Sequence, residues 1–293
     1  MTDDIIHTRE ARAHGTARVP FHLYECRMPE MYANVPAHWH GEFELNVILA
    51  GEGVLFLDGA RCAVSPGDLI VIPPNTLHAA YPRQGGTLHY DAFVFHPSLL
   101  GTGGDRSITD CINPLLSGRL AVRRQLTPEQ ERYPALRDCV RQIFSCARED
   151  TARADLLLKS ELLRLIYLLE GDAAAVQSRR PEGSDGHAIR PALSYLAEHF
   201  TETVTVEQLS ARCNLSKSHF MFCFKRSTGM SAMEHLSQLR IRAACEALSG
   251  TGQSVAEIAA DCGYNNLSNF NRQFKRQVGC SPAQYRKAIA RPG

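Results

Sequence analysis

The C-terminal third of the chain contains an internal repeat with a period of 50 residues, which restricts the fold more than any other feature. When 220–231 is placed over 270–281, the two stretches align without a gap, and further identities fall upstream at the same offset. Such self-similarity is typical of two copies of one supersecondary unit. The identical pairs are Glu207/Glu257, Ser218/Ser268, Phe220/Phe270, Phe224/Phe274, Lys225/Lys275, Arg226/Arg276, Gly229/Gly279 and Ser231/Ser281.

Each copy of the repeat has the pattern of a helix, a tight turn and a second helix. The stretches TVEQ (205–208) and SVAE (254–257) are capping-box sequences, which begin helices. Asn214 and Gly263 follow the first apolar segment of each copy, and both residue types favour turns. We therefore predict two helix-turn-helix units.

A single stretch of helical periodicity, SAMEHLSQLRIRAACEALS (231–249), separates the two copies. A helix of this length spans roughly 28 Å, because each residue adds about 1.5 Å. One turn of B-DNA is roughly 34 Å long. The connecting helix can therefore hold two recognition helices in successive major grooves, and double-stranded DNA is the expected partner.

These stretches resemble the double helix-turn-helix domain of AraC/XylS-family transcription regulators. The resemblance is carried by LSARCNLSKSHFMFCFKRSTG, by LRIRAACEALSGTGQSVAEIAADCGYNNLSNFNRQFKRQVGCSPAQYR and by the helix between the copies. It implies a bacterial, cytoplasmic regulator that acts as an activator, contacts RNA polymerase and forms a homodimer.

The second helix of each unit is the predicted recognition helix. In the second unit it begins near Asn266, and its early turns carry side chains suited to base edges, because Asn and Arg can make bidentate contacts to adenine and guanine. In the first unit the outward positions are less polar, and Phe222 can contact only a thymine methyl group, so we expect the second unit to read more of the operator. A solvated helix face is the alternative for any single position. The predicted DNA-binding residues are Lys217, Ser218, His219, Met221, Lys225, Arg226, Asn266, Leu267, Ser268, Asn269, Asn271, Arg272, Lys275 and Arg276, of which the lysines and Arg226 and Arg276 are assigned to phosphates.

Residues 19–95 have the pattern of a β-domain. Short apolar runs alternate with turn signals such as Ser65-Pro66-Gly67, and Asp58-Gly59 predicts a type I′ hairpin. Many short strands at regular spacing favour a sandwich or a barrel. This region resembles the cupin-type sensor domain of the sugar-responsive AraC relatives, which implies a cupin-like β-barrel.

The stretch HWHGEFE (38–44) concentrates polar side chains within this β-region. On one strand, His38, His40, Glu42, Glu44 and Asn46 would share a face. The stretch resembles the first cupin motif, H-x-H-x(3)-E-x(6)-G, which ends here at Gly51. The second cupin motif is matched only in part by GDLIVIPPNTLH (67–78), where Asn75 replaces the usual glycine and Pro82 replaces the closing asparagine.

Three readings of these residues remain open. Three imidazoles and a carboxylate can bind iron, manganese, nickel or zinc, so His38, His40, Glu44 and His78 are candidate ligands of a divalent metal. The same residues with Trp39 can instead form a metal-free pocket for a small polar effector, a saccharide in first place. A structural or solvated role is the third reading. The effector pocket implies a sugar-responsive regulator, which we favour. A metal site implies either a metal- or redox-sensing regulator or a metal-dependent cupin enzyme with a DNA-binding tail, and we expect no enzyme activity.

The remaining sequence connects the two domains. Residues 127–170 have helical periodicity, with Thr127-Pro128-Glu129 as the predicted start, and they are assigned to dimerisation or to packing on the β-domain. The stretch GDAAAVQSRRPEGSDGHA (171–188) has the composition of a linker. We therefore predict an α+β two-domain protein, with an effector domain at 1–125, a helical segment at 126–170, the linker at 171–188 and an all-α DNA-binding domain at 189–293.

Charge and cysteine content agree with this division. Residues 1–172 hold 17 Lys and Arg against 22 Asp and Glu, whereas residues 173–293 hold 15 against 9, so the excess of positive charge lies in the predicted DNA-binding half. The 10 cysteines form no C-x-x-C pair and are expected to be reduced thiols. Neither a membrane span nor a signal peptide is expected, because the sequence has no long apolar run.

Overall fold

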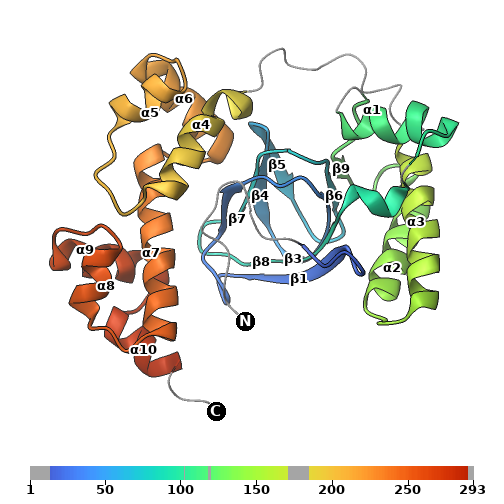
Figure 1. The fold of residues 1–293 in the computed structure, drawn as a ribbon. Helices are drawn as coiled ribbons and strands as arrows, with labels where there is room; N and C mark the ends of the chain where they lie inside the picture. The colour runs from blue at the N-terminus through green and yellow to red at the C-terminus, as the bar shows by residue number, and fades with distance from the viewer. Residues whose placement is uncertain (1–13, 102, 118–119, 171–184, 290–293) are drawn as a thin grey trace.

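The N-terminal domain consists of two antiparallel sheets that face each other (Figure 1). The computed structural model describes residues 14–101, 103–117, 120–170 and 185–289. The five-stranded sheet has the order β1-β8-β3-β6-β9, and the four-stranded sheet has the order β2-β7-β4-β5. The strands are β1 (Phe21–Met28), β2 (Val35–His38), β3 (Phe43–Gly51), β4 (Gly53–Leu57), β5 (Ala60–Val64), β6 (Leu69–Ile72), β7 (His78–Pro82), β8 (Leu88–Phe95) and β9 (Gln125–Leu126).

The two sheets do not close into a barrel, which differs from the sequence-based expectation. Among the described strands, no ladder of hydrogen bonds joins one sheet to the other. Apolar side chains from both sheets fill the space between them, including Met28, Ile48, Leu55 and Ile70. A closed barrel and two facing sheets bury the same alternating residues, so the sequence pattern cannot distinguish them. The type I′ turn is confirmed, because both of its central residues have positive φ, 48° at Asp58 and 87° at Gly59.

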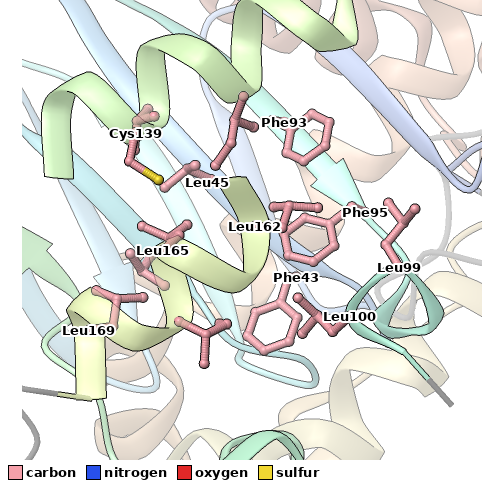
Figure 2. Close-up of a cluster of buried hydrophobic side chains, with 14 of the residues drawn as sticks. Phe43, Leu45, Phe93, Phe95, Leu99, Leu100, Cys139, Leu162, Leu165 and Leu169 are labelled. Atoms are coloured by element: carbon pink, nitrogen blue, oxygen red, sulfur yellow. The ribbon is translucent and has the colours of Figure 1, made fainter. Parts of the chain in front are cut away.

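Two long helices, α2 (Tyr133–Ala147) and α3 (Ala152–Glu170), cover the outer face of the five-stranded sheet. Figure 2 shows how the aromatic rings of β3 and β8 meet the leucines of α3. Phe43 stacks on Phe95 with the ring centroids 5.2 Å apart. Short helical segments precede α2: η1 (Pro97–Leu100), η2 (Ile108–Ile112) and α1 (Asn113–Leu116).

The predicted start of α2 at Thr127 is wrong, because the helix begins at Tyr133. Residues 127–132 form turns, in which Gln130 N donates to Thr127 O over 3.1 Å. The reason is Pro134. A helix from Thr127 would place this proline in its interior, where the missing N–H and the ring would break the hydrogen-bond ladder. In the observed helix Pro134 lies in the first turn, where proline is tolerated.

The C-terminal domain contains the two predicted units on one connecting helix. The capping boxes at Thr205 and Ser254 are both formed, and Asn214 and Gly263 have positive φ in the turns, so these predictions are confirmed. The connecting helix α7 also begins with a capping box, between Ser231 and Glu234. The helices are α4 (Asp185–Glu198), α5 (Val206–Arg212), α6 (Lys217–Thr228), α7 (Ala232–Gly250), α8 (Val255–Asp261), α9 (Leu267–Val278) and α10 (Pro282–Ile289).

The predicted end of the linker at residue 188 is wrong, because α4 already begins at Asp185. Residues 171–184 lie outside the described part of the chain. Helix α4 packs on α6 of the first unit, and its buried residues Ile189, Ala192, Leu193 and Leu196 belong to that unit's core. None of the described helices is long and apolar enough to cross a membrane. None of the 10 cysteines, all of which lie in the described part of the chain, forms a disulfide bond.

Candidate functional site

Three imidazoles and one carboxylate meet at one end of the space between the two sheets. One ligand atom from each of His38, His40, Glu44 and His78 lies within 4.8 Å of the others. The Glu44 Oε2 atom is 3.1 Å from His40 Nε2 and 3.2 Å from His78 Nε2. The rings of His38 and His78 face each other across neighbouring strands, with centroids 4.1 Å apart. We call these four residues the imidazole site.

The segment HWHGEFE is not one strand, which corrects the expectation of a single alternating face. Strand β2 ends at His38 in the four-stranded sheet, and β3 begins at Phe43 in the five-stranded sheet. The chain crosses from one sheet to the other through residues 41–42. Glu44 therefore approaches the histidines from the opposite sheet. On a single strand these side chains would lie in a row on one face. Because β2 and β3 belong to different sheets, the side chains instead approach one point from two sides.

Backbone carbonyl groups fix the orientation of two of the rings. His38 Nδ1 lies 2.9 Å from Pro36 O, and His78 Nδ1 lies 2.9 Å from Thr76 O. A carbonyl oxygen can only accept, so each Nδ1 carries the proton and donates it. The second ring nitrogen, Nε2, is then the atom through which each ring can act on a ligand, and in His78 it lies 3.2 Å from Glu44 Oε2. Such hydrogen bonds from Nδ1 are typical of histidines that bind metal ions.

Glu44 remains a carboxylate in this buried position. Burial alone raises the pKa of its carboxyl group, but His78 and His40 oppose that effect by charge and by hydrogen bonds and hold the pKa well below the usual value of 4.5. Glu44, His40 and His78 are all buried. A buried anion is stable only when cationic or hydrogen-bond donating groups surround it. The imidazole site therefore offers a carboxylate that accepts from hydroxyl groups, and imidazole and carboxylate ligands of the kind that bind a divalent cation.

A second set of groups adjoins the imidazole site through His40. One ligand atom from each of His14, His40 and Glu42 also lies within 4.8 Å of the others. His14 precedes β1, its ring centroid is 5.0 Å from that of His40, and its Nδ1 is 2.8 Å from Tyr24 Oη. On the inner side, Asn46 is buried, and its amide oxygen has no hydrogen-bond partner among the described residues. Asn46 continues the alternation of His38, His40, Glu42 and Glu44 but was not assigned to the site from the sequence, and His14 was not predicted because it lies outside the motif and precedes the first strand.

Trp39 lies away from the imidazole site. Its side chain is buried on the outer face of the four-stranded sheet, in a cluster with Leu193 and Leu196 of α4. The guanidinium group of Arg190 stands 5.3 Å from the centroid of the indole ring. Alternation along the strand explains the difference, because His38 and His40 point inward and the residue between them must point outward.

The recognition helix of the second unit, α9, exposes most of the predicted DNA-binding residues. Asn266 is its N-cap and accepts from Asn269 N over 2.9 Å. The Asn269 side chain accepts in turn from Arg272 over 3.0 Å, so these residues form one hydrogen-bonded row on the exposed face. Asn269 also lines a groove of about 270 Å³ between α7 and α9, with Arg276 and Tyr264. The exposed members are Asn266, Leu267, Ser268, Asn271, Arg272, Lys275 and Arg276, while Asn269 is half-buried.

The first unit presents a different surface on α6. Met221 and Phe222 are 50% and 59% exposed, although both are apolar. The guanidinium of Arg226 lies 6.0 Å from the Phe222 ring centroid. Lys217 forms an ion pair with Glu207 of α5, which competes with a phosphate contact. The predicted residues exposed on this helix are Lys217, Ser218, His219, Met221, Lys225 and Arg226.

The two halves of the molecule define a class of protein: a ligand-binding β-domain joined to a double helix-turn-helix domain, as in regulators of transcription. Two family models match the chain. One is an AraC-like ligand binding domain over residues 27–166, and the other is a helix-turn-helix domain over residues 209–288. The chain belongs to the AraC family of transcription regulators.

Full-length relatives are regulators of the same kind. The chain is 24% identical over 281 residues to the melibiose operon regulatory protein of Escherichia coli, covering 92% of this chain and 91% of that one. It is 25% identical over 244 residues to the arabinose operon regulatory protein of Salmonella typhimurium, covering 83% and 82%. An uncharacterized HTH-type transcriptional regulator of Bacillus subtilis is 21% identical over 280 residues, covering 95% and 96%. These relatives are transcription regulators and not enzymes.

Proposed function

We propose that this AraC-family regulator is a dimeric activator that binds a small polar effector, a saccharide, at the imidazole site. The observation that carries the proposal is the convergence of His38, His40, Glu44 and His78 on one point between the sheets. The buried amide oxygen of Asn46 and the carboxylate of Glu44 can accept from hydroxyl groups, and the histidines can donate or accept. The arabinose and melibiose operon regulators among the relatives support a sugar.

The test is a binding screen with the full chain. Monosaccharides and disaccharides are titrated while the emission of Trp39, the only tryptophan, is followed. Trp39 lies between two site histidines in the chain, so we expect saturable binding of one sugar to shift its emission. Glu44→Gln removes the charge and keeps the shape, and we expect it to weaken binding at least tenfold. If no sugar of the panel binds the folded wild-type protein, the proposal that the effector is a saccharide is wrong.

A metal-sensing regulator is the second candidate, and the fixed Nδ1 protons of His38 and His78 favour it. The ligand set of three imidazoles and one carboxylate suits zinc, nickel, iron or manganese. Metal content is measured by mass spectrometry on tag-free protein, with a His38→Ala/His40→Ala/Glu44→Ala control. Near-stoichiometric metal that the control lacks would establish this candidate. A metal-free, folded wild type would exclude it and leave the effector pocket.

Dimerisation is assigned to the outer face of α3. Leu156, Leu163 and Tyr167 are 72%, 46% and 76% exposed, and their spacing places them along one side of the helix. The opposite side, with Leu158 and Leu162, is buried on the five-stranded sheet. An apolar stripe of this kind fits the same stripe of a second copy around a twofold axis. Sedimentation of Leu163→Glu should give a monomer where the wild type gives a dimer, and a dimeric variant would move the interface elsewhere.

An activator must bind its operator and then contact RNA polymerase. The exposed polar row on α9 and the basic residues of α6 and α9 supply the operator contacts in this proposal. Reporter transcription with purified RNA polymerase, with and without the effector, tests the direction of regulation. Lower transcription in the presence of effector would make the protein a repressor.

A further inference from the structure

Strands β2 and β7 carry different chemistry on their two faces. His38 and His78 point inward and belong to the imidazole site. Their neighbours in the chain point outward, and these are small or apolar: Ala37 and Trp39 beside His38, and Leu77 and Ala79 beside His78. Each of the two histidines of the site is therefore flanked in the chain by residues of the outer surface.

The first helix-turn-helix unit covers this outer surface. Ala37, Trp39, Leu77 and Ala79 form one buried cluster with side chains of α4 and α6, and each of them is at most 7% exposed. In Figure 1 the four-stranded sheet lies on the side of the β-domain that faces α4 and α6. The core of the first unit thus continues into the sheet without a polar layer between them. The residues supplied by the unit are Ile189, Ala192, Leu193, Leu196, Phe220, Cys223 and Phe224.

A polar connection runs from α4 to the backbone of the imidazole site. The guanidinium of Arg190 stacks over Trp39 and donates a hydrogen bond to Asn75 O. Asn75 N donates to His40 O over 2.7 Å. Asn75 has a φ of 59°, so the backbone is held in the left-handed region between these two contacts. Two hydrogen bonds therefore separate the first helix of the DNA-binding domain from a histidine of the site.

A second connection reaches the end of the recognition helix. Tyr81, at the outer end of β7, donates its hydroxyl to Thr228 O over 2.7 Å, and Thr228 is the last residue of α6. A β-carbon built on the next residue, Gly229, would lie 2.7 Å from the Phe56 ring of β4. The recognition helix is thus held at its C-terminus by two strands of the sensor domain.

We infer that the outer face of β2 and β7 is the surface through which the first helix-turn-helix unit senses occupancy of the imidazole site, an inference that rests on the proposed function. A ligand that draws His38 and His78 together moves the strands that carry Trp39 and Tyr81. Packed interfaces of this kind adopt discrete arrangements and do not deform continuously. Ligand binding and operator binding are then coupled, and each changes the affinity of the other by the same factor.

The experiment measures this coupling in the full chain with Zn²⁺ as the site probe. A fluorescent duplex is first selected from a random library by the wild-type protein, and its Kd is measured with and without Zn²⁺. The interface variants are Arg190→Ala and Tyr81→Phe, neither of which contributes to the imidazole site. The matched control is Arg148→Ala, since Arg148 also stacks on an aromatic ring, 5.8 Å from the Phe144 centroid, and donates to a backbone carbonyl, but on the far side of the β-domain.

For the wild type and Arg148→Ala we expect Zn²⁺ to change the duplex Kd by a factor between about 5 and 150. Arg190→Ala and Tyr81→Phe should bring that factor to within about twofold of unity, while their Zn²⁺ affinity stays within twofold of the wild type. Zinc binding with no effect on the duplex Kd of the wild type would overturn the inference. Coupling that survives in both interface variants would overturn it as well.

A hydrogen-exchange arm decides the inference even when no Zn²⁺ binds, an outcome that would dismiss only the metal-sensing function. Peptides covering residues 35–40 and 75–82 are compared with and without the duplex, in the absence of any site ligand. We expect DNA to change exchange there in the wild type and in Arg148→Ala, and not in Arg190→Ala. Exchange that is the same with and without DNA in the wild type would show that the two surfaces are independent.

Discussion

The two helix-turn-helix units have the same framework and different surfaces. Each recognition helix ends at a glycine with positive φ, 81° at Gly229 and 86° at Gly279. Each buries two phenylalanines completely, and these are the residues that align in the repeat. At the outward positions the chemistry changes, because Met221 and Phe222 in the first unit replace Asn271 and Arg272 in the second.

The ends of the two recognition helices also differ. Gly229 is covered by Phe56 and Tyr81 of the sensor domain, whereas no described atom lies within 4 Å of a β-carbon built on Gly279. The repeat therefore conserves what folds the unit and varies what the unit contacts. The end of α6 thus contacts the sensor domain, and the end of α9 makes no such contact. Together with the inferred coupling, this difference predicts that the first unit serves regulation and the second reads most of the operator sequence.

The largest expected effect tests the shared framework. Phe224→Ala and Phe274→Ala each remove a ring that is 0% exposed, and each should lower the free energy of unfolding by about 3–5 kcal/mol. Chemical denaturation followed by circular dichroism measures both. Phe224 also belongs to the cluster shared with the sensor domain, so its loss should also reduce the protection of β7 amides against hydrogen exchange. If one of the two substitutions lowers the free energy of unfolding by less than about 1 kcal/mol, the two cores do not contribute equally to stability.

Low pH should reduce the stability of the first unit through His235, a group that the second unit lacks. His235 of α7 packs edge-on against Phe224, at the position that Tyr285 occupies against Phe274 in the second unit. Burial and Arg242 lower the pKa of His235 to about 4 from its ordinary 6.5. Neither ring nitrogen has a hydrogen-bond partner among the described residues. Above pH 6.5 the ring is neutral in both states, so acid has no effect on this group there.

As the pH falls from 6.5 to 4, the unfolded chain binds a proton at His235 that the folded chain does not. The free energy of unfolding should therefore fall by about 3 kcal/mol across this window and level off below it. His235→Tyr, which copies the second unit, should abolish that part of the pH dependence. Denaturation at pH 7 and pH 5 measures the difference. Equal pH dependence in wild type and variant would mean that His235 is protonated or hydrogen-bonded in the folded state.

Sequence reading should depend more on the second unit. Arg272→Ala removes a guanidinium that can make a bidentate contact to guanine. We expect operator binding to lose about 1–3 kcal/mol and specificity to relax at one base pair. Lys275→Ala should instead weaken binding to all duplexes by a similar factor, since phosphate contacts carry no sequence information. Binding to operators with single base-pair changes measures both. A uniform loss for Arg272→Ala would reassign it to the backbone.

The smallest expected effect concerns the apolar surface of the first unit. Phe222→Ala should reduce operator affinity by about 0.8 kcal/mol for each thymine methyl group it covers. Replacing those thymines by deoxyuridine removes only the methyl groups, and it should produce the same loss in the wild type and none in Phe222→Ala. A variant that still responds to deoxyuridine would show that the contact lies elsewhere, and an unchanged affinity in both experiments would assign Phe222 to a protein partner.

Much of the DNA-binding domain was predicted from the sequence because its signals are local. Capping boxes at Thr205 and Ser254, turns at Asn214 and Gly263 and the span of the connecting helix all depend on residues within a few positions of one another. The strands β2 and β7 were harder to interpret from the sequence. Both are short, and polar His38 and His78 face inward while apolar Trp39 and Leu77 face outward, where the first helix-turn-helix unit buries them. Large apolar residues at the outward positions were the sequence signal of a second layer.

The sequence alone determined the two helix-turn-helix units, the connecting helix and the group of residues His38, His40, Glu44 and His78 as candidates for one site. The units and the connecting helix follow from periodicity and capping, which are properties of short stretches, whereas the group of four residues follows from the resemblance of two stretches to the cupin motifs. Only the tertiary structure decided that the sheets face each other without closing, that the site is built at the corner between them, and that Trp39 belongs to the domain interface. Those outcomes depend on which elements pack together. Packing is set by the burial of apolar surface from distant parts of the chain, which no single stretch records.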